Sequence, residues 1–179
     1  MLLLNTYFVP INQVKLNTDG SSLGNPGRAS RGGLIRDANE GWIKGFTHNI
    51  RVSSSIEVEL WALRDDLSLC LSLNIPTVEI EIDAKVVFEW ITNGNRTNLN
   101  LSSLIVDCRT FSSRIPQVKL LHYFREANKY VDALARKGHF SQQDFVIFDS
   151  LPVDISMLLY YNSIGVYYER ICPQTSLPG

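Results

Sequence analysis

Long apolar runs are missing from this chain of 179 residues. A helix needs about 20 consecutive apolar residues to cross the hydrocarbon core of a bilayer, and no segment approaches that length. The opening residues Met1–Leu4 also lack the basic start, the longer apolar stretch and the cleavage site of a secretory signal. We therefore expect a protein of the nucleus or cytoplasm that is not secreted and has no membrane partner.

Cysteine is scarce as well, and occurs only as Cys70, Cys108 and Cys172. An odd number of widely spaced thiols, two of them within apolar periodic segments, is typical of buried cysteines in a reducing compartment. No CxxC pair is present, so the sequence gives no support to a zinc ribbon or a disulfide framework.

Basic residues are not in excess: 17 Lys and Arg stand against 18 Asp and Glu, for a formal net charge of -1. Proteins that hold nucleic acid by bulk electrostatics normally have a strongly basic balance. Any nucleic-acid site must therefore be local, and we expect weak, salt-sensitive binding. The length and the 45% hydrophobic content suffice for one core without disulfide staples, which excludes a disordered chain.

Alternation of apolar and polar residues predicts three strands at the start of one domain. Residues 1–13 show no sustained period and form a lead-in segment. Turn-forming residues separate the strands, and the second and third form an antiparallel hairpin. The predicted strands are Val14–Asp19, Gly32–Asp37 and Gly41–Thr47.

After Ser53 the apolar residues recur at steps of three and four, which predicts a helix. Ser54 and Glu57 have the capping-box spacing of a helix start. Strands and helices then alternate along the chain. We predict a strand over Val78–Asp83, helices around Val86–Ile91 and Leu104–Phe111, a strand over Val118–Phe124 and a helix over Glu126–Lys137.

This order predicts an α/β fold, because a three-strand meander followed by alternating units forms one mixed sheet with helices on its faces. We assign residues 14–138 to this domain. Residues 139–179 are too apolar for a free linker, so we expect them to pack on the domain or on a partner.

Four acids lie where such a fold can bring them together, because sites in open sheets form beyond the carboxyl ends of strands. Asp19 and Asp83 each end a predicted strand. Glu59 lies in the first turns of the first helix, and Asp132 lies within the last. Each acid taken alone is more simply explained as a solvated surface group, which is also what we expect of Asp66.

Convergence of the four acids would have a chemical consequence, since crowded carboxylates repel one another unless cations neutralise them. Ligand sets made only of oxygen select hard cations such as Mg²⁺ or Mn²⁺. Two such cations about 4 Å apart can activate water and stabilise the leaving oxygen of a phosphodiester. The pattern therefore predicts metal-dependent phosphodiester hydrolysis.

Short segments surround these acids in a definite order. They are Thr18-Asp19-Gly20-Ser21, Gly24-Asn25-Pro26-Gly27, Val58-Glu59-Leu60 with Ala62, Ile82-Asp83, and Asn128 with Asp132-Ala133-Leu134-Ala135. Together they resemble the signature segments of type 1 ribonuclease H, in the retroelement-derived, reverse-transcriptase-like form common in plant genomes. The resemblance covers about residues 14–138, with a looser likeness in the tail.

The resemblance implies a ribonuclease H-like fold with a five-stranded mixed sheet in the order 3-2-1-4-5 and helices on both faces. It implies an endonuclease that hydrolyses the RNA strand of an RNA/DNA hybrid, with water as nucleophile, and leaves 5′-phosphate and 3′-hydroxyl ends. Asp19, Glu59, Asp83 and Asp132 would bind two Mg²⁺ ions, with Mn²⁺ as a substitute. We expect a monomer, and the sequence identifies no protein partner.

The resemblance also indicates residues that act on the substrate. Asn25, in the glycine-rich turn, would sense the 2′-hydroxyl of RNA, although a plain hairpin turn is the alternative. Arg125, which we count with the catalytic set, stands where many members carry a histidine; it can steady phosphate charge but cannot act as a base. The alternative is an exposed electrostatic group. The substrate-binding residues we expect are Gly20, Ser21, Gly24, Asn25, Ser54, Ser55 and Lys85.

The sequence departs from the family pattern at residues close to the expected phosphate contacts. Ser53–Ile56 stands where the family usually offers asparagine or threonine to a phosphate; serine hydroxyls can bind one, but the isoleucine cannot. Ala84 replaces the serine or threonine that often follows the third acid, and Lys85 could compensate. His122 shares the apolar face of its strand, so we expect it to be structural.

Three functional hypotheses remain open. The leading one is an RNA/DNA-hybrid ribonuclease of type 1. The second is a non-catalytic nucleic-acid-binding or interaction module derived from a retroelement, which the altered phosphate turn and the low positive charge favour. The third keeps the fold and the metals but changes the substrate, as in integrase-like or exonuclease relatives, and the asparagine turn argues against it.

Overall fold

A computed structural model describes residues 13–39, 41–94, 98–122 and 129–157. Within these ranges no helix is both long and apolar enough to cross a membrane. In chain order the elements are β1 Val14–Gly24, β2 Gly27–Asp37, β3 Trp42–Ser53, α1 Ser55–Ser72, β4 Thr77–Ile82, α2 Lys85–Thr92, the 3₁₀ helix η1 Leu99–Leu101, α3 Ser102–Arg114, β5 Gln117–His122, α4 Lys129–Gly138 and β6 Phe145–Phe148.

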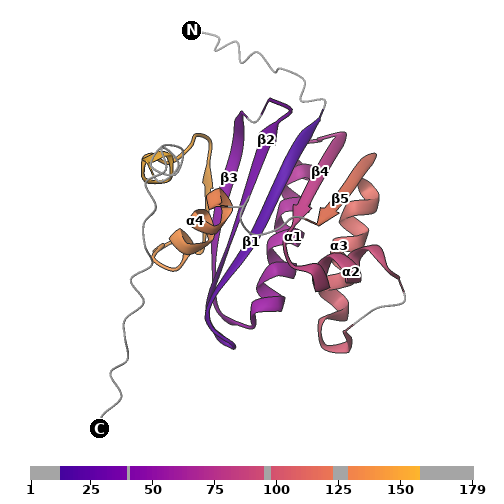
Figure 1. The fold of residues 1–179 in the computed structure, drawn as a ribbon, viewed down its shortest axis with the longest axis horizontal. Helices are drawn as coiled ribbons and strands as arrows, with labels where there is room; N and C mark the ends of the chain where they lie inside the picture. The colour runs from indigo at the N-terminus through magenta and orange to yellow at the C-terminus, as the bar shows by residue number, and fades with distance from the viewer. Residues whose placement is uncertain (1–12, 40, 95–97, 123–128, 158–179) are drawn as a thin grey trace, which may run out of the picture.

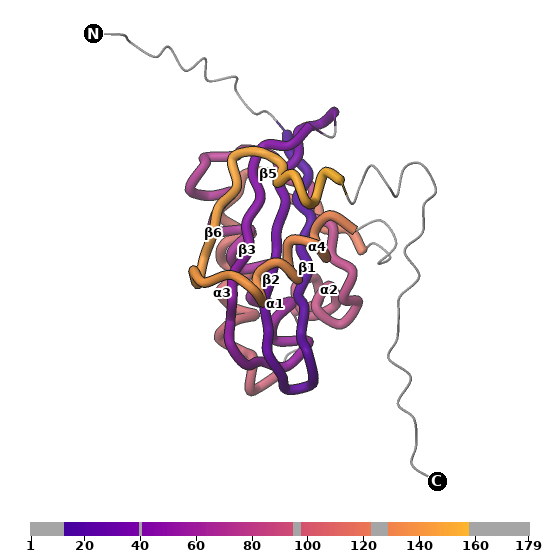
Figure 2. The backbone as a smooth tube through the Cα atoms, turned by 90° about the vertical axis from the view of Figure 1, so that its left-hand side faces the viewer, coloured from indigo at the N-terminus to yellow at the C-terminus, as the bar shows by residue number. Residues whose placement is uncertain are grey.

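One mixed sheet organises the molecule, with its strands in the order β5-β4-β1-β2-β3-β6 (Figure 1). β4 is parallel to both β1 and β5, and the other neighbours are antiparallel. The predicted α/β class and the order 3-2-1-4-5 are confirmed. The sheet gains a sixth strand, β6, which lies beside β3 (Figure 2). The sequence did not reveal it, because a four-residue apolar run has too little period to be assigned to a strand.

The hairpin of β1 and β2 is longer than the sequence predicts. β1 continues past Asp19 to Gly24, and β2 already begins at Gly27. The ladder pairs Ser21 with Ser30 in a stretch whose glycine and serine content had indicated a turn. Pairing with a neighbouring strand has overridden the weak strand propensity of these residues.

The two faces of the sheet carry separate cores. Ile35 belongs to the larger cluster, which includes residues of α1, α2 and α3, whereas the adjacent Leu34 packs with Leu134 of α4 on the other face. This alternation is the ordinary period of a strand. The apolar stripe predicted for α1 is confirmed by the complete burial of Leu60, Leu63, Leu67 and Cys70.

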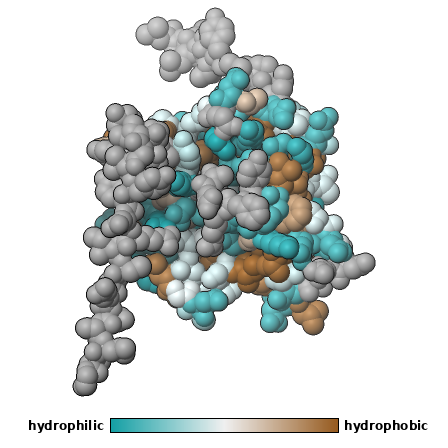
Figure 3. Space-filling view, viewed as in Figure 1, coloured by the Kyte–Doolittle hydropathy of each residue, from teal (hydrophilic) through white to brown (hydrophobic). Residues whose placement is uncertain are grey.

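The surface seen from the side of Figure 1 mixes hydrophilic and hydrophobic side chains (Figure 3). Large apolar residues remain exposed at several places, among them Leu99 in η1 and Phe140 in the turn after α4. Exposed apolar residues of this kind are normal in soluble domains and do not mark a binding site by themselves.

Candidate metal centre

Asp19 and Asp83 lie close together because β1 and β4 run parallel. The last residue pair of their ladder joins Asn17 to Glu81. Two residues further along each chain come Asp19, within β1, and Asp83, which directly follows the end of β4 at Ile82. Matching positions on adjacent parallel strands meet at the same edge of a sheet, as the sequence analysis assumed.

Glu59 reaches the same place from α1. Gly20 lets the helix approach the strand, since a Cβ atom there would lie 2.6 Å from Cγ1 of Val58 and 3.0 Å from the backbone nitrogen of Glu59. The N–H of Gly20 donates a hydrogen bond of 3.0 Å to Oε2 of Glu59. Gly20, which we predicted as a substrate contact, therefore has a clear structural task in bringing Glu59 against β1.

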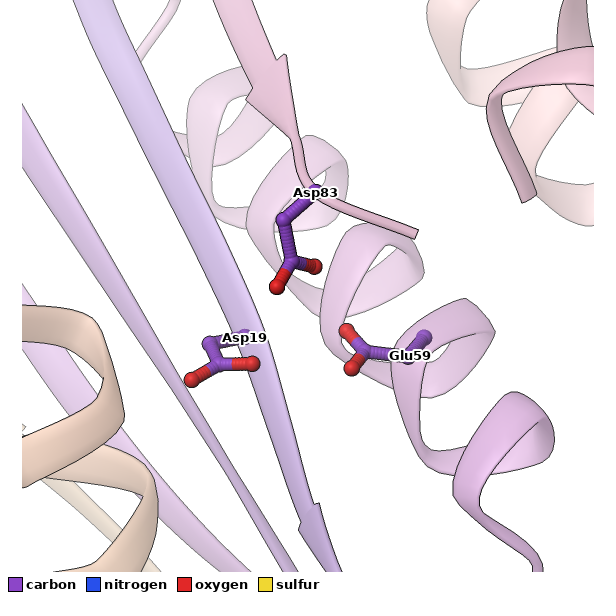
Figure 4. A group of neighbouring side chains, drawn as sticks. All are labelled: Asp19, Glu59 and Asp83. Carbon is purple, nitrogen blue, oxygen red and sulfur yellow. The ribbon is translucent and has the colours of Figure 1, made fainter. Parts of the chain in front are cut away.

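The carboxylates of Asp19, Glu59 and Asp83 point toward one another (Figure 4). One oxygen of each lies within 4.8 Å of the other two. Asp19 and Glu59 are buried, and Asp83 is half-buried. Three carboxylates this close repel one another, and an oxygen-only donor set suits a hard divalent cation. These residues therefore fit a metal centre.

Asp132 stands outside this group, so the structure brings together three of the four predicted acids. It lies in the first turn of α4, and 42% of its side chain is exposed. Arg136 binds both of its carboxylate oxygens, at 3.0 and 2.9 Å. Four-residue spacing on a helix favours such an ion pair. The pair with Arg136 competes with binding of the Asp132 carboxylate at the metal centre.

His122 ends β5, close to the predicted site. Arg125, which we predicted as a catalytic residue, lies outside the described residues. Nε2 of His122 donates a hydrogen bond of 3.1 Å to the carbonyl oxygen of Asp83. From the sequence we predicted a structural role for this histidine. This hydrogen bond places His122 against the backbone of Asp83, an acid of the centre. The contact is possible because His122 on β5 is paired with Ile82 on β4.

Four of the predicted substrate residues gather where the β1–β2 turn meets the start of α1. Oδ1 of Asn25 accepts a hydrogen bond of 3.2 Å from the backbone N–H of Ser55. Ser54 caps the helix by accepting a hydrogen bond from the N–H of Glu57, as its spacing predicts. Gly24 has a φ of 113°, a left-handed value that favours glycine. These residues form what we call the turn–helix junction: Gly24, Asn25, Ser54 and Ser55.

The two remaining predicted substrate residues occupy different elements. Ser21 lies on the same face of β1 as Asp19, and its hydroxyl makes a 3.1 Å hydrogen bond with the ring of His139. His139 is buried, and burial lowers its pKa. No motif in the sequence pointed to this histidine. Lys85 is the first residue of α2, two positions after Asp83.

Comparison with known proteins gives a family match over most of the chain. A family model described as reverse transcriptase-like matches residues 17–138. A curated Arabidopsis thaliana protein named as a ribonuclease H protein is 36% identical over 155 residues, which are 87% of this chain. The chain spans 25% of the length of that relative.

Solved structures share the fold. RNase H1 from the halophilic archaeon Halobacterium salinarum NRC-1 aligns with a TM-score of 0.68 and 25% identity, over 71% of this chain and 97% of that one. LC11-RNase H1, isolated from compost and solved in complex with an RNA/DNA hybrid, aligns with a TM-score of 0.66 and 21% identity, over 71% of this chain and 96% of that one. The ribonuclease H-like fold predicted from the sequence is confirmed.

Proposed function

The chain belongs to the reverse transcriptase-like family, and from this membership we propose that it hydrolyses the RNA strand of an RNA/DNA hybrid. The observation that carries the proposal is the convergence of Asp19, Glu59 and Asp83, which supplies the acidic centre that such hydrolysis needs. Similarity to RNase H1 proteins, one of them solved with a hybrid, supports the choice of substrate.

Asp19, Glu59 and Asp83 would hold divalent cations, with Mg²⁺ as the physiological ion and Mn²⁺ as a substitute. Asp132 is the proposed fourth ligand. Binding there requires its carboxylate to leave Arg136, and an exposed pair of this type contributes only about 0.5 kcal/mol. The chemistry that two bound cations would supply is activation of a water and stabilisation of the leaving 3′-oxygen, which would give 5′-phosphate and 3′-hydroxyl ends.

The turn–helix junction is the proposed contact for the RNA strand. Because Oδ1 of Asn25 already accepts a hydrogen bond from Ser55, the Asn25 amide would meet a 2′-hydroxyl as a donor, through Nδ2. Lys85 and Arg125 offer positive charge to the phosphates. An arginine stays protonated near neutral pH, so Arg125 would steady charge rather than accept a proton.

The test is cleavage of an end-labelled RNA/DNA hybrid by the purified chain in Mg²⁺ and in Mn²⁺. We expect the wild type to cut the hybrid, and the Asp19→Asn, Asp83→Asn double variant to lose at least about 100-fold in rate, because neutral amides bind hard cations poorly. Asp149→Asn is the matched control: this acid is 83% exposed, pairs with Lys44 and lies outside the centre, so its rate should equal that of the wild type.

Equal rates for the wild type and the double variant would contradict the proposal. Single-stranded RNA of the same sequence separates hybrid cleavage from a contaminating ribonuclease, since only the hybrid should be cut. End analysis of the products tests for the 5′-phosphate and 3′-hydroxyl.

A non-catalytic hybrid-binding module is the second candidate, and the pairing of Asp132 with Arg136 favours it. It predicts binding of a fluorescent hybrid without cleavage in either metal. Because this chain spans a quarter of its curated relative, the activity, substrate and partners of that whole protein are proposals here too.

A further inference from the structure

We propose that Arg36, Asn17 and Glu81 form a positioning network that sets the separation of Asp19 and Asp83 and thereby the affinity of the centre for divalent cations. The proposal rests on the proposed function, because it assumes that the acidic centre binds metal. It assigns a task to three residues that the metal site itself does not use.

The network is a chain of side-chain contacts across three strands. The guanidinium of Arg36, on β2, donates through Nε to Oδ1 of Asn17 at 3.1 Å, and a second bond to the same oxygen comes from its terminal nitrogen. The amide of Asn17, on β1, donates to Oε2 of Glu81 on β4. The terminal nitrogen of Arg36 also lies 3.7 Å from that carboxylate oxygen.

Asn17 and Glu81 are shielded from water, so their polar atoms need hydrogen-bond partners within the protein. Asn17 is 3% exposed and Glu81 7% exposed. A buried carboxylate is tolerated when a cation and hydrogen-bond donors compensate it, and Arg36 with Asn17 supplies both. A buried network that is satisfied in this way holds its members in one arrangement.

The position of the network connects it to the centre. Asn17 and Glu81 are the last paired residues of the β1–β4 ladder. Asp19 comes two residues after Asn17, and Asp83 comes two residues after Glu81. Alternation along β1 places Asn17 and Asp19 on the same face. The amide of Asn17 therefore adds a side-chain tie between the two strands at the last pair of their ladder, two residues before the acids.

The test is Mn²⁺ binding, followed by the electron paramagnetic resonance signal of free Mn²⁺, without any activity assay. Asn17→Leu removes the hydrogen bonds to Arg36 and to Glu81 while conserving charge and approximate volume. We expect its Kd for Mn²⁺ to rise about tenfold or more, the scale on which outer hydrogen-bond partners tune metal sites. Arg36→Lys keeps the charge but loses the planar fork, and should weaken binding in the same direction.

Ile105→Val is the control for a general loss of stability. Ile105 is fully buried on α3, which carries none of the acids, so this variant should unfold more easily and still bind Mn²⁺ like the wild type. Urea unfolding of every variant establishes that the metal titrations are made on folded protein. If Asn17→Leu does not fold, Asn17→Ser replaces it, because the shorter side chain also fails to bridge Arg36 and Glu81.

Each outcome decides the proposal. Wild-type affinity in folded Asn17→Leu, or equal weakening in Ile105→Val, would overturn the network while leaving the metal centre intact. Wild-type protein that binds no Mn²⁺ would overturn the metal centre and the network together. Selective weakening in Asn17→Leu and Arg36→Lys supports the network.

Discussion

Asp66 of α1 is a buried carboxyl group whose ionisation destabilises the folded protein. Its side chain is fully buried, and its carboxyl lies so close to β2 that a Cβ atom on Gly33 would come within 2.0 Å of Oδ1. Burial raises the pKa of Asp66 well above its ordinary value of 3.8, and the nearby charge of Asp65 adds to the rise. The folded protein therefore holds a proton on Asp66 more strongly than the unfolded chain does.

The raised pKa has a definite sign for stability. Below pH 3.8 both states hold the proton, whereas above it the unfolded chain ionises first, so stability falls as pH rises toward the folded pKa. We expect Asp66→Asn to raise Tm at pH 7 by about 3 °C or more and to flatten the dependence of Tm on pH above pH 4. Thermal unfolding across pH 4–8 measures both. A slope equal to that of the wild type, or the same flattening in the exposed Asp149→Asn, would rule out this role for Asp66.

The docking of α4 on the sheet includes a close approach between Gly32 of β2 and the helix backbone. A Cβ atom on Gly32 of β2 would lie 2.6 Å from the backbone nitrogen of Ala135 and 2.8 Å from Cβ of Leu134. Backbone atoms cannot rotate away, so Gly32→Ala must push the helix off the sheet. We expect a loss of about 1–3 kcal/mol in the free energy of unfolding, measured in urea.

Gly94 offers the matched control for Gly32→Ala, because a Cβ atom there meets no described residue within 4 Å. Gly94→Ala should leave stability unchanged within about 0.5 kcal/mol. Because α4 carries Asp132, Gly32→Ala should also slow hybrid cleavage if that acid acts at the centre. Equal stability of the two variants would mean that α4 is not held by this contact.

At the scale of elements, the sequence pattern predicted the features that depend on residues close together in the chain. The period of α1 and its Ser54 cap were evident from the sequence. The approach of Asp19 to Asp83 was predictable as well, because parallel pairing of β1 with β4 brings the two acids together. The length of the first hairpin was not predictable, since pairing across the ladder overrode the turn propensity of Gly20–Leu23.

Side-chain partners across elements were the harder part. The link between Asn17 and Glu81 needs the strand register, which one sequence does not display. Asp66 did carry a usable signal: it lies three residues after Leu63 and four before Cys70, on the buried stripe, but its residue type favoured a solvated group. The prediction that Asp66 is solvated was therefore wrong, because helical position outweighed polarity.

At the scale of the whole molecule, residues 145–157, which follow α4, are part of the folded structure. β6 extends the sheet along β3, and the indole nitrogen of Trp42 donates to the carbonyl oxygen of Phe148 at 3.4 Å. Ile155 is 3% exposed and belongs to the second core with Leu34 and Leu134. The core beneath α4 is therefore completed by residues beyond the predicted domain of 14–138.

Two residues of this segment allow its contribution to the free energy of unfolding to be measured. Ile155→Ala should lower the free energy of unfolding by about 2–5 kcal/mol, because it opens a cavity beneath α4. Val153, two positions earlier, is 74% exposed, so Val153→Ala should change stability by less than about 0.5 kcal/mol. Urea unfolding followed by tryptophan fluorescence compares the two variants, and Trp42 lies beside this core. If both variants match the wild type, residues 145–157 contribute nothing to the stability of the sheet; if Ile155→Ala alone is destabilised, the cooperative unit extends beyond residue 138.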